Sequence, residues 1–182
     1  MKPSNPISGR VAKRLGIAPK APRIPLAKQK WVKAIPEGSH GSGTLQKRLW
    51  RLVSDYVRIR DWHKYRTCVA TGVPIARWQD GQAGHYLAYS TCHGMYKFFE
   101  GNVHLQSASS NGWGGMEIGY AFGEELKRRG IDPDVLKKDN WRTELKINDS
   151  KVKEKMEDIL GKMIELPEQP SYFNRVIELR SV

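Results

Sequence analysis

The chain of 182 residues has only two cysteines, no long apolar run and comparatively few acidic residues. Two cysteines are too few for a disulfide framework, so we expect both thiols to be reduced. No apolar stretch approaches the roughly 20 residues of a membrane-spanning helix, and the first residues lack the apolar core of a secretory signal. We therefore expect a cytoplasmic protein that has no membrane partner.

The shortage of acidic residues leaves a large positive charge. Asp and Glu number 19 against 31 Lys and Arg, which gives a formal net charge of +12 at pH 7. Each Lys or Arg that contacts a phosphate releases a counterion, so a nucleic acid is the first partner to consider. Ribosomal, capsid-lining and membrane-surface proteins can be equally basic. A chain of this length is expected to form one ordinary core with appendages.

The positive charge and the prolines gather at the N-terminus. Residues 1–44 contain nine Lys or Arg, six of the ten prolines and one acidic residue, Glu37. Proline fixes φ and removes an amide donor, so we expect a basic arm that is flexible or extended. Its Gly-rich end, residues 37–43, is expected to be a flexible joint; the alternative is a solvated tail with no specific role. The candidate DNA contacts in the arm and just after it are Lys13, Arg14, Lys28, Lys30, Arg48 and Arg51.

The remaining sequence predicts an α+β fold. Apolar residues at helical spacing indicate a helix from Leu45 to about His63. Two antiparallel strands are expected at 83–89 and 102–106, followed by helices at about 109–129, from 132 and at 150–165, with a terminal strand at 173–179. We assign 45–140 to a core domain, on which the C-terminal helix and strand of 141–182 pack.

A strand, a second strand and a helix in this order can bring catalytic groups together. His85 lies on the first strand, and Asn111 lies near the start of the helix. Hydrolysis of a phosphodiester at neutral pH needs a base for water and a cation to stabilise the charge that develops on phosphorus. Histidine suits the base because its pKa lies near neutrality. His104 is expected to face away from His85 and to form structural hydrogen bonds.

The triplet Gly84-His85-Tyr86, followed by Asn102 and then by Asn111 nine residues later, resembles the HNH (ββα-metal) endonucleases. More narrowly, residues 49–136 resemble recombination proteins of the phage-lambda NinG (Rap) type. The resemblance implies a ββα-metal core in which His85 is the catalytic base. It also implies that Asn102 pins the loop that orients this histidine, and that Asn111 is a metal ligand.

The chain departs from the NinG type at the structural zinc site. Proteins of that type hold zinc with two Cys-x-x-Cys pairs. Here Cys68 is present, but Thr71, Ser107 and Ser110 occupy the other three positions. Zinc needs four nitrogen or sulfur ligands, so we expect no structural zinc at these positions.

The second departure concerns the catalytic metal. Gly84 precedes the histidine, and Gln82 stands where NinG-type proteins carry an acid. Asp80 is the nearest candidate for the carboxylate ligand, and Glu100 and Glu117 are weaker ones. Oxygen ligands of this kind suit Mg²⁺ or Mn²⁺.

The resemblance implies a metal-dependent endonuclease that acts on branched DNA in phage recombination, such as Holliday junctions or D-loops. Two symmetric nicks in a junction would favour a homodimer. An alternative is a non-catalytic, architectural DNA-binding protein on a decayed HNH scaffold. A third possibility is a basic protein embedded in a larger assembly.

Overall fold

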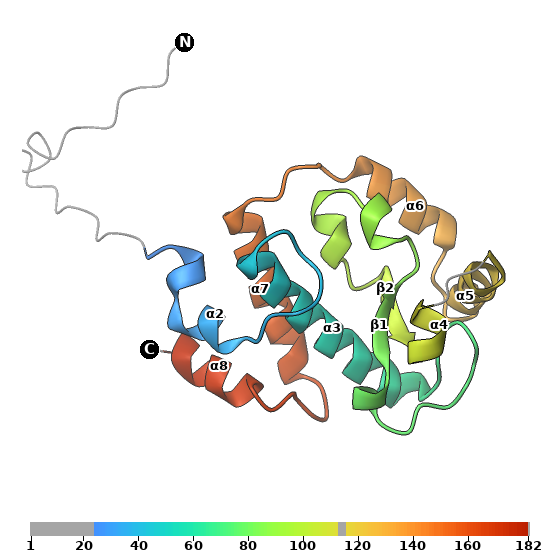
Figure 1. Ribbon diagram of the computed structural model, residues 1–182, viewed down its shortest axis with the longest axis horizontal. Helices are drawn as coiled ribbons and strands as arrows, with labels where there is room; N and C mark the ends of the chain where they lie inside the picture. Colours follow the sequence, from blue (N-terminus) through green and yellow to red (C-terminus); the bar gives the residue numbers. More distant parts are fainter. Residues whose placement is uncertain (1–23, 113–115, 182) are drawn as a thin grey trace, which may run out of the picture.

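The longest element is helix α3 (Thr44–Tyr65), which runs through the middle of the molecule between the other helices and the strands (Figure 1). A computed structural model describes residues 24–112 and 116–181, apart from the side chains of 112–118. The buried residues of α3 include Leu49, Leu52 and Val53, which share one face of the helix. The helix ends at Arg66, whose φ of 58° is left-handed. The helix expected from the apolar spacing is confirmed.

Two short strands lie against α3. Strand β1 (Gln82–His85) pairs antiparallel with β2 (Val103–Gln106), so that Gln82 lies opposite Gln106 and His85 opposite Val103. Strand β1 ends sooner than expected because the chain turns away after His85. It then forms two 3-10 helices, η3 (Tyr89–Thr91) and η4 (Gly94–Phe98). With another short 3-10 helix, η2 (Trp78–Asp80), before β1, the described residues combine many helices with one small sheet. The broad α+β class is confirmed.

The helices next in sequence after the second strand lie on one side of the molecule. Helix α4 (Ala108–Gly112) begins directly after β2, and α5 (Met116–Arg128) and α6 (Pro133–Arg142) complete this side of the molecule. Gly130, with a φ of 78°, lies just beyond α5 and gives this helix a left-handed C-terminal residue. Asp132 caps α6 by accepting a hydrogen bond from the amide of Asp134.

The buried apolar residues that the structure describes form two clusters. The larger joins α3 to α7 (Asp149–Ile164) and includes Met156, Leu160 and Met163. The smaller surrounds Leu105 and includes Phe122 and Leu126 of α5. The hairpin of β1 and β2 lies at their boundary, since Val103 belongs to the larger cluster and Leu105 to the smaller.

The prediction of a terminal strand at 173–179 is wrong. These residues form helix α8 (Phe173–Arg180), which packs against α2 (Lys30–Ala34) at one end of the molecule (Figure 1). Phe173 and Val176 are its buried residues. Their spacing of three places both on one helical face, whereas alternate burial would be required in a half-buried strand.

The expected boundary of the basic arm is also wrong. The 3-10 helix η1 (Leu26–Lys28) and helix α2 contribute buried side chains to the larger cluster, including Trp31 and Val32. Residues 24–44 therefore belong to the folded core. Counting prolines and charges missed the apolar residues interspersed among them. Residues 1–23 lie outside the described part of the chain.

The Gly-rich segment 37–43 is packed against α3, not a free joint. A Cβ atom on Gly38 would lie 2.8 Å from Cδ1 of Trp50 and 3.0 Å from the carbonyl oxygen of Lys47. Gly41 has a φ of 127°, and a Cβ there would lie 2.7 Å from the amide nitrogen of Lys47. These glycines let the backbone approach the first turns of α3.

Within the described residues, no helix combines the length and apolar character needed to cross a membrane.

Candidate functional site

A cavity of about 350 Å³ lies beside the hairpin, between its strands and helices α4 and α5. It brings together residues of the predicted motif and residues that the motif did not include. Its lining is His40, His85, Tyr86, Ala88, Tyr89, Gln106, Ser110, Asn111, Gly119 and Phe122. A second cavity of about 310 Å³ adjoins it and shares His40 and Asn111.

His85 ends β1, and its two ring nitrogens have different surroundings. Nε2 lies 2.9 Å from the carbonyl oxygen of Lys97. A carbonyl only accepts hydrogen bonds, so Nε2 carries the proton and Nδ1 has the free lone pair. Burial lowers the pKa of His85 to about 4, and repulsion from a charge on His40 adds to this effect, while the bond to Lys97 opposes it. The imidazole is therefore neutral at neutral pH and able to accept a proton.

Asn102 is fully buried behind the cavity and holds the chain that leaves β1. Its Oδ1 accepts a hydrogen bond from the amide of Leu87 at 2.8 Å, and its Nδ2 donates to the carbonyl of the same residue at 3.1 Å. Nδ2 also lies 3.4 Å from Sγ of Cys92. The backbone amide of Tyr86 donates to the carbonyl of Asn102 at 2.9 Å. These contacts are those of a residue that fixes the loop after His85.

Asn111, in α4, lies on the other side of the cavity. Its Nδ2 donates to Oε1 of Gln82 at 2.8 Å, which directs Oδ1 elsewhere. A Cβ built on Gly84 would lie 2.6 Å from this Oδ1 and 1.8 Å from Oε1 of Gln106. Both amide oxygens thus lie over the same glycine. A side chain at position 84 would displace both amide oxygens.

Gln106 is a site residue that the sequence reasoning missed. Its side chain is only 4% exposed, yet it lines the cavity. A glutamine on a fully buried strand needs a polar partner, so its place on β2 after Leu105 was an available signal.

The oxygens of Asn111 and Gln106 suit a hard cation such as Mg²⁺, but they bring no negative charge. No carboxylate is among the described residues that line the cavity. In the described part of the chain, no three His, Cys, Asp or Glu side chains form a group that could hold a metal. The residues present fit a cation that shares its ligands with water and with a phosphate supplied by the substrate.

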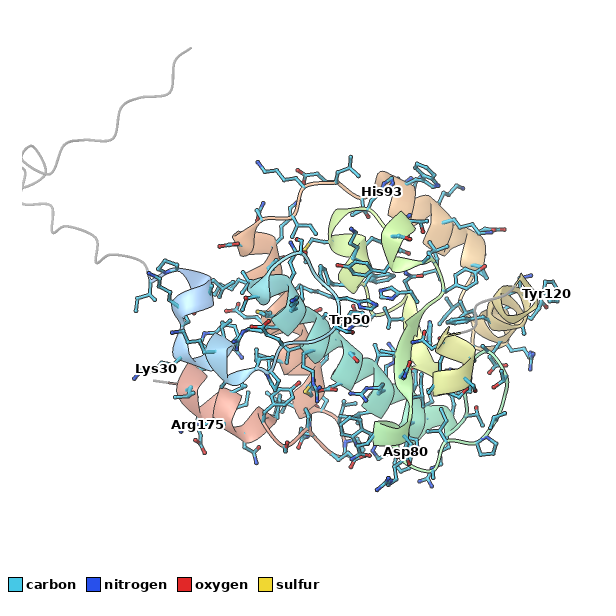
Figure 2. All side chains as sticks on the ribbon, in the orientation of Figure 1. Lys30, Trp50, Asp80, His93, Tyr120 and Arg175 are labelled. Atoms are coloured by element: carbon cyan, nitrogen blue, oxygen red, sulfur yellow. The ribbon has the colours of Figure 1, made fainter. Side chains whose placement is uncertain are left out.

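Asp80, the first expected carboxylate ligand, does not line the cavity. It is exposed and pairs with Arg77, whose Nη2 lies 2.8 Å from its Oδ1. Figure 2 shows it at the rim of the molecule, while Trp50 lies near the middle of the view. The 3-10 turn η2 places Asp80 before β1 begins, at the opposite end of the strand from His85.

The weaker candidates for the carboxylate differ in outcome. Glu100 is engaged elsewhere, because it pairs with Lys155 at 2.6 Å and also with Lys162. The side chain of Glu117 lies outside the described part of the chain.

His104 has the structural role that was expected. It is buried, with Nδ1 3.3 Å from Oδ2 of Asp61 and Nε2 3.0 Å from the carbonyl oxygen of Gly101. Burial alone would raise the pKa of Asp61, but hydrogen bonds and charge from His104 and Arg60 outweigh this and hold it well below its usual range. The Asp61 carboxylate is thus a fixed anion that ties β2 to α3.

The expected DNA contacts have different positions. Arg48 is engaged within the protein, because its Nη1 lies 2.9, 2.5 and 2.6 Å from the carbonyl oxygens of Val32, Lys33 and Ile35 at the end of α2. Arg51 is held by the buried carboxylate of Asp55 at 2.7 Å.

Lys28 and Lys30 are both exposed. Figure 2 shows Lys30 projecting at the end of the molecule that carries α2 and α8. Lys13 and Arg14 lie outside the described residues.

The residues at the four positions that hold zinc in NinG-type proteins lie close together in this chain. Sγ of Cys68 is 3.2 Å from Oγ of Ser110, which is 3.1 Å from Oγ of Ser107. Burial raises the pKa of Cys68, but hydrogen bonds from Ser110, Thr71 and nearby backbone outweigh this and lower it to about 7. Hydrogen bonds therefore connect the side chains of this cluster.

His40 was missed because residues 37–43 were interpreted as a joint. It lines both cavities and stacks on Trp50, with ring centroids 4.8 Å apart. The glycines on either side of it, Gly38 and Gly41, were the available signal.

Comparison of the chain with models of known protein families, with curated proteins and with solved structures returned no match.

Proposed function

We propose that the protein is a metal-dependent DNA endonuclease with a ββα-metal core of the HNH type. The observation that carries the proposal is His85, a neutral imidazole with its Nε2 proton committed to a backbone carbonyl, in a cavity that Asn111 also lines. The order of β1, β2 and α4, and the contacts of Asn102 with the loop after His85, support the same reading.

In the proposed reaction, Nδ1 of His85 takes a proton from the water that attacks phosphorus. The hydrogen bond to Lys97 stabilises the imidazolium that forms, because its acceptor is already in place. A bound divalent cation would neutralise charge on the phosphate. Asn111 and Gln106 would hold that cation through their amide oxygens, and the substrate phosphate would complete its ligands.

The substrate class rests on charge and on the resemblance to NinG-type proteins. A net charge of +12 favours polyanions, and exposed lysines such as Lys28 and Lys30 are available for phosphate contacts that do not depend on sequence. Branched DNA, and a homodimer that makes two symmetric nicks, are the finer parts of the proposal.

The decisive experiment removes the base. His85→Ala should abolish nicking of supercoiled plasmid and of synthetic branched DNA, a loss of about 10²–10⁴ in rate, while DNA affinity stays near the wild-type value. His63→Ala is the matched control, because His63 is also half-buried but pairs with Glu168 away from the cavity. If His85→Ala cuts as fast as this control, the nuclease proposal fails.

Asn111→Ala tests the cation. A lost ligand weakens metal binding and leaves the base intact, so activity should fall and then partly recover at raised Mg²⁺ or Mn²⁺. The same titration should leave His85→Ala inactive. A variant at Asn111 that no metal concentration rescues would contradict the ligand role.

An architectural DNA-binding protein on the same scaffold is the second candidate. The absence of a carboxylate among the described lining residues favours it. This candidate predicts tight binding of branched DNA with no cleavage by the wild-type protein at any concentration of divalent cation.

A further inference from the structure

His40 and His85 lie side by side on one face of Trp50. Each imidazole centroid is 4.8 Å from that of the indole, and the planes differ by 10° and 15°. The two imidazole centroids are 6.0 Å apart. Contacting parallel rings are separated by about 3.5 Å, so imidazoles on opposite faces of the indole would be about 7 Å apart or more. The shorter distance places both on the same face.

The chain builds this arrangement with several independent contacts. Gly38 and Gly41 allow the loop to lie against α3, as described above, and the indole Nε1 of Trp50 donates to Oγ of Ser39 at 3.2 Å. The ring of Tyr89 meets His40 edge-on, with centroids 4.9 Å apart. His40 is thus a positioned side chain, although it comes from a segment without helix or strand.

Both imidazoles line the same cavity, so both can reach one bound phosphate. The other charged groups near His40 are Arg58, which lines the second cavity, and Lys97, whose Nζ lies 4.9 Å from the ring of Tyr89. Arg58 is paired with the buried carboxylate of Asp55. No described carboxylate faces the two histidines across either cavity.

We propose that His40 is a second catalytic residue, which donates a proton to the leaving oxygen of the phosphodiester. This inference rests on the proposed nuclease function and adds a general acid to it. In-line displacement places the attacking and leaving oxygens on opposite sides of phosphorus, so a base and an acid must be two separate groups. Two histidines side by side on a rigid indole satisfy that requirement.

The proton balance is complete with one water molecule. His85 takes one proton from the attacking water as the new P–O bond forms. His40 gives one proton to the leaving oxygen as the old P–O bond breaks. His85 then releases its proton to solvent and His40 regains one, which restores both groups. A positive charge on His40 disfavours a second charge on His85.

The experiment compares two leaving groups. One substrate is a DNA strand with an ordinary scissile phosphodiester; the other carries a bridging sulfur in place of the leaving oxygen. A thiolate leaves without a proton, so it does not need an acid. His40→Ala should cut the ordinary strand about 10²-fold more slowly than wild type and cut the sulfur-bearing strand at nearly the wild-type rate.

His40→Gln keeps a hydrogen-bond donor of similar length but cannot transfer a proton, so it should behave as His40→Ala does. His63→Ala should match wild type on both substrates. Equal losses on both substrates, or recovery of the ordinary rate in His40→Gln, would overturn the acid role in favour of a positioning one. No loss in either variant would also overturn it.

The failure of this inference is distinguishable from failure of the proposed function. If His85→Ala abolishes cleavage while the His40 variants are unaffected on both strands, the nuclease proposal stands and the role of His40 falls. If His85→Ala has no effect, the proposed function itself falls.

Discussion

The side chain of Asn102 pairs with the backbone of Leu87 as a neighbouring strand would. Its Oδ1 accepts a hydrogen bond from the Leu87 N–H, and its Nδ2 donates one to the Leu87 carbonyl. Leu87 lies two residues after His85, so these hydrogen bonds fix the backbone that follows the imidazole. Asn111, nine residues later, is exposed and faces the cavity instead. The two asparagines of the motif therefore differ in what their removal should change.

Asn102→Ala should lower the free energy of unfolding by about 1–3 kcal/mol, because it leaves the amide of Leu87 without its partner. It also removes one of the two hydrogen bonds to the Leu87 carbonyl, which keeps the one from Sγ of Cys92. It should also lower activity, since the loop that follows His85 loses its anchor. Asn111→Ala is the control and should change stability by less than about 1 kcal/mol. Urea unfolding of the two variants measures the difference. Equal stability losses would show that Asn102 does not pin the loop.

The pH dependence of stability tests the environment of His85. Its folded pKa of about 4 lies below the unfolded value of about 6.5, so between these values only the unfolded chain binds the proton. The stability of the folded state should therefore fall as pH decreases through this window and hold steady above it.

His85→Phe keeps a ring on Trp50 and removes the titration. When the pH is lowered from 7 to 4.5, the unfolding free energy of wild type should fall by about 2 kcal/mol more than that of this variant. Other titrating groups cancel in the difference. A constant difference across that range would mean that the imidazole is not desolvated.

The sequence predicted the parts of the fold that depend on local spacing. Helix α3 follows from the apolar residues on its inner face, and α6 from Asp132 and Pro133 at its start. The terminal segment was assigned to a strand because six or seven residues rich in Phe, Val and Ile fit either structure. Packing against α2, which is distant in sequence, decides in favour of a helix.

The sequence supplied the candidate motif but not its surroundings. His85, Asn102 and Asn111 were chosen from the resemblance to HNH endonucleases. The structure places His85 and Asn111 on one cavity, and Asn102 against the loop that follows His85. His40 comes from a loop more than forty residues before His85, and its packing on Trp50 and Tyr89 brings it to the cavity. Asp80 was chosen by sequence proximity, and the turn at η2 directs it away.

Arg48→Ala should affect stability more than DNA binding. Its guanidinium satisfies the carbonyls at the end of α2, so the variant should unfold about 2–3 kcal/mol more easily. Lys30→Ala, an exposed charge on the same helix α2, should leave stability unchanged and reduce the slope of log affinity against log salt. Thermal unfolding and salt-dependent DNA binding measure the two effects. The reverse pattern would restore Arg48 as a phosphate contact.

The cluster around Cys68 should bind zinc once Thr71, Ser107 and Ser110 are replaced by cysteine. The Cys68 and Ser110 side chains are in contact at 3.2 Å, and Ser107 and Thr71 hydrogen-bond within the same cluster. A tetrahedral site with Zn–S bonds of about 2.3 Å separates its sulfur atoms by about 3.8 Å, so small side-chain shifts suffice.

The wild-type protein should purify with well under one zinc per chain and should not unfold on addition of a chelator. The triple variant Thr71→Cys, Ser107→Cys and Ser110→Cys should bind one zinc per chain and melt at a higher temperature, and a chelator should reverse both effects, because metal binding adds to folding free energy. Adding Cys68→Ser to that variant removes the fourth thiolate and should weaken zinc binding. Elemental analysis and thermal unfolding measure each step.

Stoichiometric zinc in the wild type would refute the expectation that hydrogen bonds serve here in place of a metal. A triple variant that binds none would show that these four positions do not form a tetrahedral site.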